Sequence, residues 1–484
     1  MLSVGAGLGI LTLLLAWSHG TLTSLDLLPI IQTHANAQLF GWIGLFAMGF
    51  AYQGLPRFKY VQLWRPRAAN CSLHLMLAGL ALRMTGAVPA AWAPYTATAG
   101  AALEAAAAAL FATVMVKTLS RSTVRDRWDL YVVTALAAFV AMGLAEPFLT
   151  YRSLTAAADD TKIRFTADFM APYRNLQLFG FGAMLVLGVG QRILPTAFGF
   201  RTVGARACLG AWIAAVMGLA AGFVGWALFR GTGDRTWAIA SWGGDLLFLA
   251  SALWLAFELR GFTGGAPGRS RKFIRAAFWW LLGGALILAV APLRMATLHA
   301  FPHGLYGAAR HAIGLGFLSM MILGVSSKVV PILKGFDPAR EPALWVPFTL
   351  ITAGLALRIL GQLATDGGSG AALALTAASG PLTALGFLVW GLHMWGLIGR
   401  TRPEGAAAAA GPRVAPDVTV AQIVDWYPAT LEVFESFGFR ELKNPLLRNT
   451  IGRRTTIRAA CSMKNVDLDA FVAALTAKLR DAKS

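Results

Sequence analysis

The sequence has 484 residues, of which 57% are hydrophobic and only 13% are charged. Soluble domains carry about 25% charged residues, so the composition excludes an ordinary soluble protein and favours a membrane protein. The formal net charge is +19, but the basic residues fall between apolar runs, where they indicate membrane topology rather than nucleic-acid binding. We therefore expect most of the chain to lie in a lipid bilayer, and we expect no nucleic acid as a partner.

Twelve apolar runs are candidates for membrane-spanning helices, because about 20 apolar residues are needed to cross the hydrocarbon layer. Their lengths, and the lack of an alternating pattern, favour helices over a β-barrel. The first run follows Met1 without a basic region or a cleavage site, so we interpret it as a retained helix. The runs are approximately 2–17, 37–55, 70–88, 93–116, 129–150, 173–195, 204–229, 237–258, 273–293, 307–329, 343–363 and 378–398.

Basic residues cluster after every second span. Arg57 and Lys59 follow the second span, Lys117 follows the fourth, and Arg400 and Arg402 follow the last. Because basic loops stay in the cytoplasm, we expect both ends of the chain to be cytoplasmic.

A pattern of two glycines and a proline recurs three times. The second glycine comes eight residues after the first, and the proline seven residues later. The first glycines are Gly41, Gly180 and Gly316, which divide the chain at nearly equal intervals. Such glycines are also common packing residues in membrane helices, but the near-equal spacing favours a repeat. We expect three four-helix units, at about 1–128, 129–272 and 273–400, around a pseudo-threefold axis.

The chain changes character after Thr401. Residues 401–416 form a linker rich in Ala, Gly and Pro, and residues 417–484 are polar. Val420, Ile423, Val424 and Tyr427 form an apolar stripe with helical spacing. We expect a small soluble helical domain.

Polar residues stand at the outer start of the second, sixth and tenth spans. Asn36, Asn175 and His311 each lie five residues before the first glycine of the repeat, and His34 lies seven before it. These corresponding positions indicate a shared site.

Two arginines fall inside predicted spans. Arg83 follows Pro56 at the same interval at which Arg358 follows Pro331, so the two arginines occupy corresponding positions of the repeat. A charge at membrane depth is costly unless it is paired, so each arginine either pairs with a buried anion, such as a cofactor carboxylate, or extends to the headgroups. Glu146, which precedes a proline, is either a proton-handling residue or an interfacial helix end.

Four histidines, His34, His299, His303 and His311, fall near the extracytoplasmic ends of their segments. Imidazoles from different helices can hold a haem or a metal in a bundle, and they suit iron, copper and zinc. His299 and His303 have a metal-ligand spacing, although Pro302 interrupts a regular helix. The alternative for each histidine is a polar residue satisfied within the protein.

The stretches HANAQLFGW, from His34, and RHAIGLG, from Arg310, resemble the NnrS family of twelve-span membrane proteins. The resemblance implies a b-type haem, copper as a second metal, and a response to nitric oxide in the inner membrane of bacteria. It makes His34 and His311 ligand candidates; Asn36 stands where the family has a second histidine.

A distant resemblance extends to the catalytic subunit of haem–copper oxidases. It implies an all-α polytopic fold with twelve transmembrane helices in three four-helix repeats. The adjacent histidine pair that binds copper in that subunit is not present, so full reductase chemistry is not expected. The tail resembles the DUF1858 domain, often a redox-disulfide module, but Cys461 stands alone, which favours a docking or regulatory role.

Our first hypothesis is a haem-binding membrane protein that binds or processes nitric oxide or related small ligands. It leaves open whether the protein is a haem-dependent oxidoreductase, with an electron donor or regulatory protein at the tail. The alternatives are a transporter for a metal or small anion, and a membrane sensor or scaffold that signals through its tail.

Overall fold

The computed structural model describes residues 2–21, 24–59, 61–156, 158–298, 301–401, 414–443, 452 and 455–481. Every regular element in these residues is a helix, so the prediction of an all-helical fold is confirmed for them. The chain divides into two compact units, one of residues 1–329 with 338–399 and the other of residues 330–337 with 400–484.

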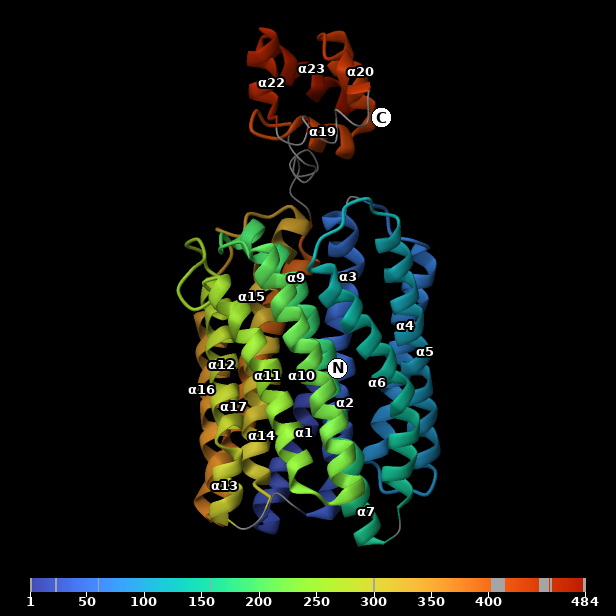
Figure 1. The fold of residues 1–484 in the computed structure, drawn as a ribbon, viewed down its shortest axis with the longest axis vertical. Helices are drawn as coiled ribbons and strands as arrows, with labels where there is room; N and C mark the ends of the chain where they lie inside the picture. Colours follow the sequence, from blue (N-terminus) through green and yellow to red (C-terminus); the bar gives the residue numbers. More distant parts are fainter. Residues whose placement is uncertain are drawn as a thin grey trace. The chain divides into compact units, whose positions relative to one another are not determined.

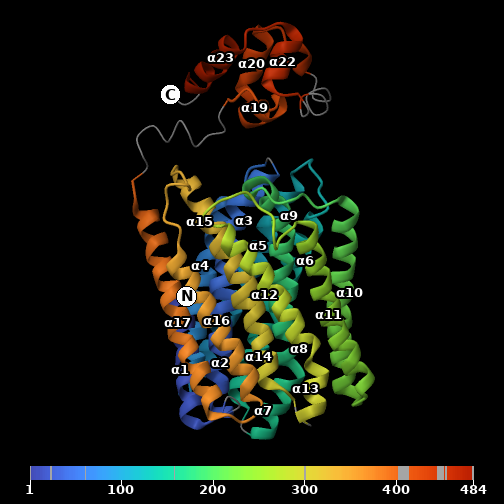
Figure 2. The same ribbon diagram turned by 90° about the vertical axis from the view of Figure 1, so that its left-hand side faces the viewer.

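The helices of the first unit run alongside one another (Figures 1 and 2). In chain order they begin with α1 (Leu2–His19), η1 (Leu25–Leu27), α2 (Leu28–Asn36), η2 (Ala37–Gly44), α3 (Leu45–Phe58), α4 (Pro66–Arg83), η3 (Met84–Ala87), α5 (Ala93–Ser120) and α6 (Asp129–Thr155). Next come α7 (Asp159–Phe165), η4 (Thr166–Met170), α8 (Ala171–Asn175), η5 (Leu176–Ala183), α9 (Met184–Phe198), α10 (Ala205–Thr232) and α11 (Arg235–Glu258). The series ends with α12 (Arg271–Ala289), α13 (Ala291–Leu298), α14 (His303–His311), η6 (Ala312–Ser319), α15 (Met320–Lys334), α16 (Trp345–Thr365) and α17 (Gly370–Gly399). The last residues of α15, from Val330, belong to the second unit.

Nine helices in the described residues are long and apolar enough to cross a membrane. The other three predicted spans coincide with helical residues 2–19, 28–58 and 66–83, which are not among the nine. The nine are Ala93–Ser120, Asp129–Thr155, Asp159–Phe198, Ala205–Thr232, Arg235–Glu258, Arg271–Ala289, His303–Lys334, Trp345–Thr365 and Gly370–Gly399.

Three of the central helices contain a π-helical stretch of eight residues: η2, η5 and η6. Each stretch begins four residues before the first glycine of its copy of the glycine–proline pattern. The stretch η5 contacts both η2 and η6. π-helical turns are rare, and they are frequent at functional sites. The three contacting stretches are therefore candidate positions for such a site.

Glycines bring three pairs of neighbouring helices together at their backbones. A Cβ atom at Gly79 would lie 2.8 Å from the carbonyl oxygen of Gly100, between α4 and α5. A Cβ atom at Gly218 would lie 2.6 Å from the backbone nitrogen of Phe248, between α10 and α11. A Cβ atom at Gly354 would meet Oγ1 of Thr383, between α16 and α17. Small residues allow this close approach in membrane helices. The three glycines are spaced in the sequence as the first glycines of the repeat are.

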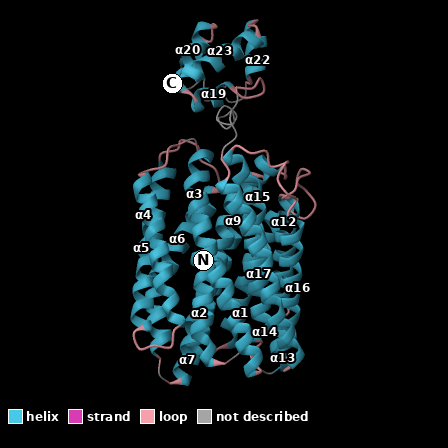
Figure 3. Cartoon of the chain, turned by 180° about the vertical axis from the view of Figure 1, so that it is seen from behind, coloured by secondary structure: helices cyan, strands magenta, loops and turns pink. Residues whose placement is uncertain are grey.

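The second unit has a helical core of its own. Its helices are α19 (Val420–Trp426), η7 (Pro428–Thr430), α20 (Leu431–Ser436), η8 (Arg440–Lys443), α22 (Ile457–Lys464) and α23 (Leu468–Asp481), shown in cyan with the other helices in Figure 3. Phe434, Ile457 and Phe471 are fully buried at its centre. Thr419 starts α19 with a capping box, in which its hydroxyl oxygen accepts from the amide of Gln422.

Candidate functional site

His34 lies two residues before the end of α2, and its ring rests against α1. Its Nδ1 lies 2.7 Å from the carbonyl oxygen of Gly5. Because a carbonyl oxygen only accepts, Nδ1 carries the hydrogen, and the neutral ring leaves Nε2 free as a ligand atom. Gly9 makes room for the ring, since a Cβ atom there would lie 2.8 Å from Cε1.

His311 ends α14 and has the same type of contact. Its Nδ1 lies 2.8 Å from the carbonyl oxygen of Gly307, four residues earlier in the helix. Its Nε2 is therefore also available to a ligand in the neutral ring. Histidines that bind metals usually donate their other ring hydrogen in this way, which fixes the ring and its tautomer.

Positively charged side chains surround the two histidines. His311 lies within electrostatic range of His34, Arg310 and Arg358, and His34 lies within range of Arg174 and Arg358. Within the described residues, no hydrogen bond or ion pair engages the guanidinium of Arg358, which is partly buried on α16. The structure therefore brings together three of the predicted site residues, His34, His311 and Arg358.

The other two predicted histidine ligands are placed differently. His303 is exposed at the start of α14, where its ring packs against Phe301 with a centroid distance of 4.8 Å. His299 lies outside the described residues. Nothing in the described part of the chain brings His303 to His34 and His311.

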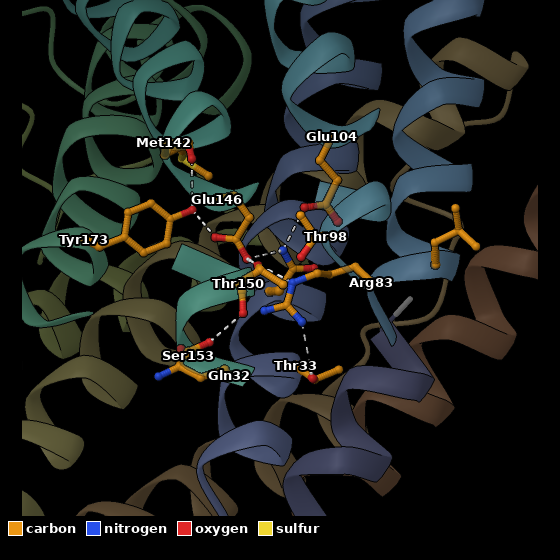
Figure 4. Close-up of polar contacts among 12 residues, drawn as sticks. Gln32, Thr33, Arg83, Thr98, Glu104, Met142, Glu146, Thr150, Ser153 and Tyr173 are labelled. Atoms are coloured by element: carbon orange, nitrogen blue, oxygen red, sulfur yellow. Dashed lines mark hydrogen bonds and ion pairs between the residues drawn. The ribbon is translucent and has the colours of Figure 1, made fainter. Parts of the chain in front are cut away.

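Asn36 belongs to a second cluster, in which it joins two buried carboxylates, Glu104 and Glu146, which Figure 4 labels. Its Nδ2 donates to Oε2 of Glu104 on α5 at 2.9 Å and to Oε1 of Glu146 on α6 at 3.2 Å. All three residues are at most 2% exposed. The amide therefore holds the two acids on either side of one nitrogen.

Arg83 is part of the same cluster and not of the histidine group. Its Nε lies 3.1 Å from Oε1 of Glu146, and both side chains are 3% exposed. Tyr173 of α8 donates to Oε2 of Glu146 from the opposite side. Figure 4 shows these side chains converging from separate helices. The buried anion that pairs with Arg83 is thus a carboxylate of the protein itself.

A second asparagine repeats the contact of the first. Asn175 donates through Nδ2 to Oδ2 of Asp245 at 2.8 Å, across 70 residues, while the contact from Asn36 to Glu104 crosses 68 residues. The two asparagines occupy the corresponding positions that the sequence pattern identifies. At the third such position stands His311.

Several residues of these two clusters were not predicted as site residues from the sequence. Glu104 was visible only as one of few carboxylates in the spans, and no spacing related it to Asn36. Gly5 and Gly9 are four residues apart in the first span and face His34 and Gln38, which are also four residues apart. Residues four apart lie on the same face of a helix. The equal spacing of the two glycines and of His34 and Gln38 was therefore a sequence signal that these helix faces could pack together.

The nitrogen atoms of His34 and His311 fit the needs of a haem iron better than those of a metal ion held by the protein alone. In the described residues, no three His, Cys, Asp or Glu side chains form a group that could hold a metal ion. A haem iron needs one or two axial ligands from the protein, and two imidazoles with free Nε2 atoms and an unpaired arginine fit that need. Two narrow crevices in the first unit are lined by Gln32 and Ser153 with other residues, and neither includes His34 or His311.

Two family models match the sequence. The model described as NnrS protein matches residues 2–402, and the model of the domain of unknown function DUF1858 matches residues 415–472. No curated protein matches the sequence.

Proposed function

Because the chain belongs to the NnrS protein family and carries a DUF1858 domain, we propose that it is a haem-binding membrane protein that binds or processes nitric oxide. The family name links it to the nitric oxide response. The observation that carries the proposal is the pair of partly buried imidazoles, each fixed by a hydrogen bond from Nδ1 to a backbone carbonyl. One or both of His34 and His311 would supply Nε2 to the iron of a b-type haem; nitric oxide binding requires that one axial position stays open.

The surrounding charges favour a cofactor with carboxylate groups. Arg358, which has no anionic partner in the described residues, would pair with a haem propionate. Arg83 is already paired with Glu146, so of the two arginines predicted from the sequence, Arg358 is the one left for this role. A haem iron with an open axial position binds diatomic gases, whereas a six-coordinate iron favours electron transfer.

The proposal includes a threefold internal arrangement of twelve helices. Three features of the structure support it: the π-helical stretches, the glycine contacts of neighbouring helices, and the paired contacts of Asn36 and Asn175. The first two features recur at the intervals of the glycine–proline pattern. In this arrangement His34 and His311 come from the first and third units.

Absorption spectra of the full chain test the haem proposal. The protein would be produced with an adequate haem supply and purified in detergent, and we expect a Soret band. His34→Ala and His311→Ala should each reduce the band or shift it. His74→Ala is the matched control, because His74 has the same Nδ1 contact with the carbonyl of Asn70, at 2.9 Å, but is exposed.

Two other spectral results would contradict parts of the proposal. A Soret band that is unchanged in both variants would remove His34 and His311 as ligands. The lack of any Soret band in the wild-type protein would overturn the proposal and favour a transporter or a scaffold. Iron and copper are measured in the same samples, because copper is the second metal that the family resemblance implies.

Basic residues follow every second span. We therefore place the chain in a bacterial inner membrane with both of its ends in the cytoplasm. An electron donor or a regulatory protein would bind the DUF1858 domain. The single cysteine of that domain, Cys461, is 2% exposed, which supports a docking role over thiol chemistry.

A further inference from the structure

The cluster around Asn36 contains more acid than base. Glu104 and Asn36 are fully buried and Glu146 is 2% exposed. The carboxylates each accept from the same amide nitrogen, at 2.9 and 3.2 Å. Like charges that share a buried site do not both ionise, because each destabilises the other and water does not screen them.

The charged and titratable groups that face the two acids come from two further helices. Arg83 of α4 forms an ion pair with Glu146. Tyr173 of α8 has one hydroxyl hydrogen for two acceptors, Oε2 of Glu146 and, at 3.0 Å, the carbonyl oxygen of Met142. Arg174, also of α8, lies within electrostatic range of Glu146, but its guanidinium donates to two glutamines, Gln32 and Gln177.

The two acids differ in their hydrogen bonds. Glu146 accepts from Asn36, from the cation of Arg83 and from Thr150 at 3.3 Å, and it shares the hydroxyl hydrogen of Tyr173 with the carbonyl oxygen of Met142. Several donors, one of them a cation, favour a carboxylate. Glu104 accepts only from Asn36, at Oε2. Glu104 is therefore the acid whose hydrogen bonds leave room for a proton.

Two buried oxygen atoms in the cluster have no hydrogen-bond partner among the described residues. They are Oε1 of Glu104 and Oδ1 of Asn36. Buried polar atoms are almost always paired. A hydrogen on Glu104 converts its carboxylate into a donor, and Oδ1 of Asn36 only accepts. The unpartnered atoms thus point to one missing hydrogen.

A polar route leads from the cluster toward one end of the first unit. Glu146, Thr150 and Ser153 line one narrow crevice together with Gln32. Gln32 and Ser153 also line a second crevice, with Lys162. Ser153 donates to the carbonyl oxygen of Thr150 at 3.1 Å (Figure 4).

We propose that Glu104, Asn36 and Glu146 form a proton-binding site, in which Glu104 holds one proton and exchanges it past Glu146 and Thr150 with the crevice at Ser153. The step breaks the O–H bond of Glu104 and forms an O–H bond on the acceptor in the crevice, so no electrons are transferred. The site contains neither His34 nor His311 and does not depend on a bound haem.

Infrared difference spectra of the full chain in water and in deuterium oxide test the proposal. We expect the carbonyl stretch of a protonated carboxylic acid, shifted by deuteration, and its loss in Glu104→Gln. Glu258→Gln is the matched control at the end of α11 and should keep the band. The wild-type measurement needs no variant to fold, and the lack of the band there overturns the proposal.

Two further outcomes would also overturn it. A band of the same intensity in Glu104→Gln would place the proton elsewhere. A band that disappears on addition of sodium ions would identify a cation site instead of a proton site. Ser153→Leu should keep the band but slow its exchange in deuterium oxide, whereas Thr155→Leu, an exposed position on the same helix, should not; equal exchange in both would exclude the route.

Discussion

Gly79 and Gly100 lie so close together that a Cβ atom on Gly79 would be 2.8 Å from the carbonyl oxygen of Gly100. The backbone nitrogen of Glu104 would also lie 2.9 Å from that Cβ atom, so the new methyl group would meet the backbone of α5 at two points and not the end of a flexible side chain. We expect Gly79→Ala to destabilise the protein by about 1–3 kcal/mol, as overpacking of a well-packed core does. Thermal unfolding in detergent would measure the effect as a lower midpoint.

Gly243 provides the control for this prediction. It lies within α11, and a Cβ atom there would meet nothing within 4 Å. Gly243→Ala should therefore leave the midpoint unchanged or raise it slightly, since alanine favours a helix over glycine. Equal midpoints for both variants would show that α4 and α5 do not depend on this contact.

Gly9→Ala should weaken haem binding without removing a ligand. The new Cβ atom would lie 2.8 Å from Cε1 of His34 and would push the ring away from the carbonyl of Gly5. Loss of such supporting contacts typically lowers metal affinity by about 10- to 100-fold. Haem titration followed at the Soret band measures the change. Gly7→Ala is the control on the same helix, because its Cβ atom would meet nothing within 4 Å. Equal haem affinities of the two variants would contradict the proposed role of the contact between His34 and α1.

The three cysteines should react with an alkylating reagent at different rates. Cys71 is exposed, whereas Cys208 and Cys461 are buried. Burial, and then the charge of Asp467, raise the pKa of the Cys461 thiol, so at neutral pH it is neither accessible nor ionised. Mass spectrometry of the folded chain should find Cys71 modified first. Modification of Cys461 at the rate of Cys71 would show that the thiol is reactive.

The same pKa shift sets the direction of a pH effect on the second unit. Because the pKa of Cys461 is raised in the folded state, its contribution to stability is present below the ordinary thiol pKa and decreases as pH rises above it. Alkylation of Cys461 should therefore accelerate at alkaline pH more steeply than that of Cys71.

Composition and run length predicted the all-helical, membrane-like character of the chain, because both depend only on apolar content along the sequence. The repeat pattern predicted a shared site for the polar residues at the outer starts of three spans. The structure divides these residues between two clusters: Asn36, which corresponds to His311 in the repeat, pairs with Glu104, whereas His34, two residues earlier, lies within electrostatic range of His311. Repeat positions fix the height of a residue along its helix, but they do not fix the neighbour that it faces.

The partners of individual polar residues could not be predicted in the same way. Arg83 and Arg358 occupy matching positions in the sequence, yet Arg83 pairs with Glu146 and Arg358 has no such partner in the described residues. Pairing depends on which residue a neighbouring helix presents at that height. Asn36 and Glu104 are 68 residues apart, and no local pattern connects them.

Lys59 should be essential for the stability of the loop that follows α5. Its Nζ lies 2.7 Å from Oδ2 of both Asp126 and Asp129 and 4.4 Å from the ring centroid of Trp128, and its side chain is 1% exposed. Lys59→Met would leave two carboxylates facing each other with no cation between them. Breaking a buried ion pair in this way costs about 3–5 kcal/mol, and we expect the lower end because the side chain of Asp126 is 38% exposed.

Lys117→Met, at an exposed position of α5, is the control. Thermal unfolding should separate the two variants, and an unchanged midpoint for Lys59→Met would mean that the packing of α3 holds the loop without the ion pairs.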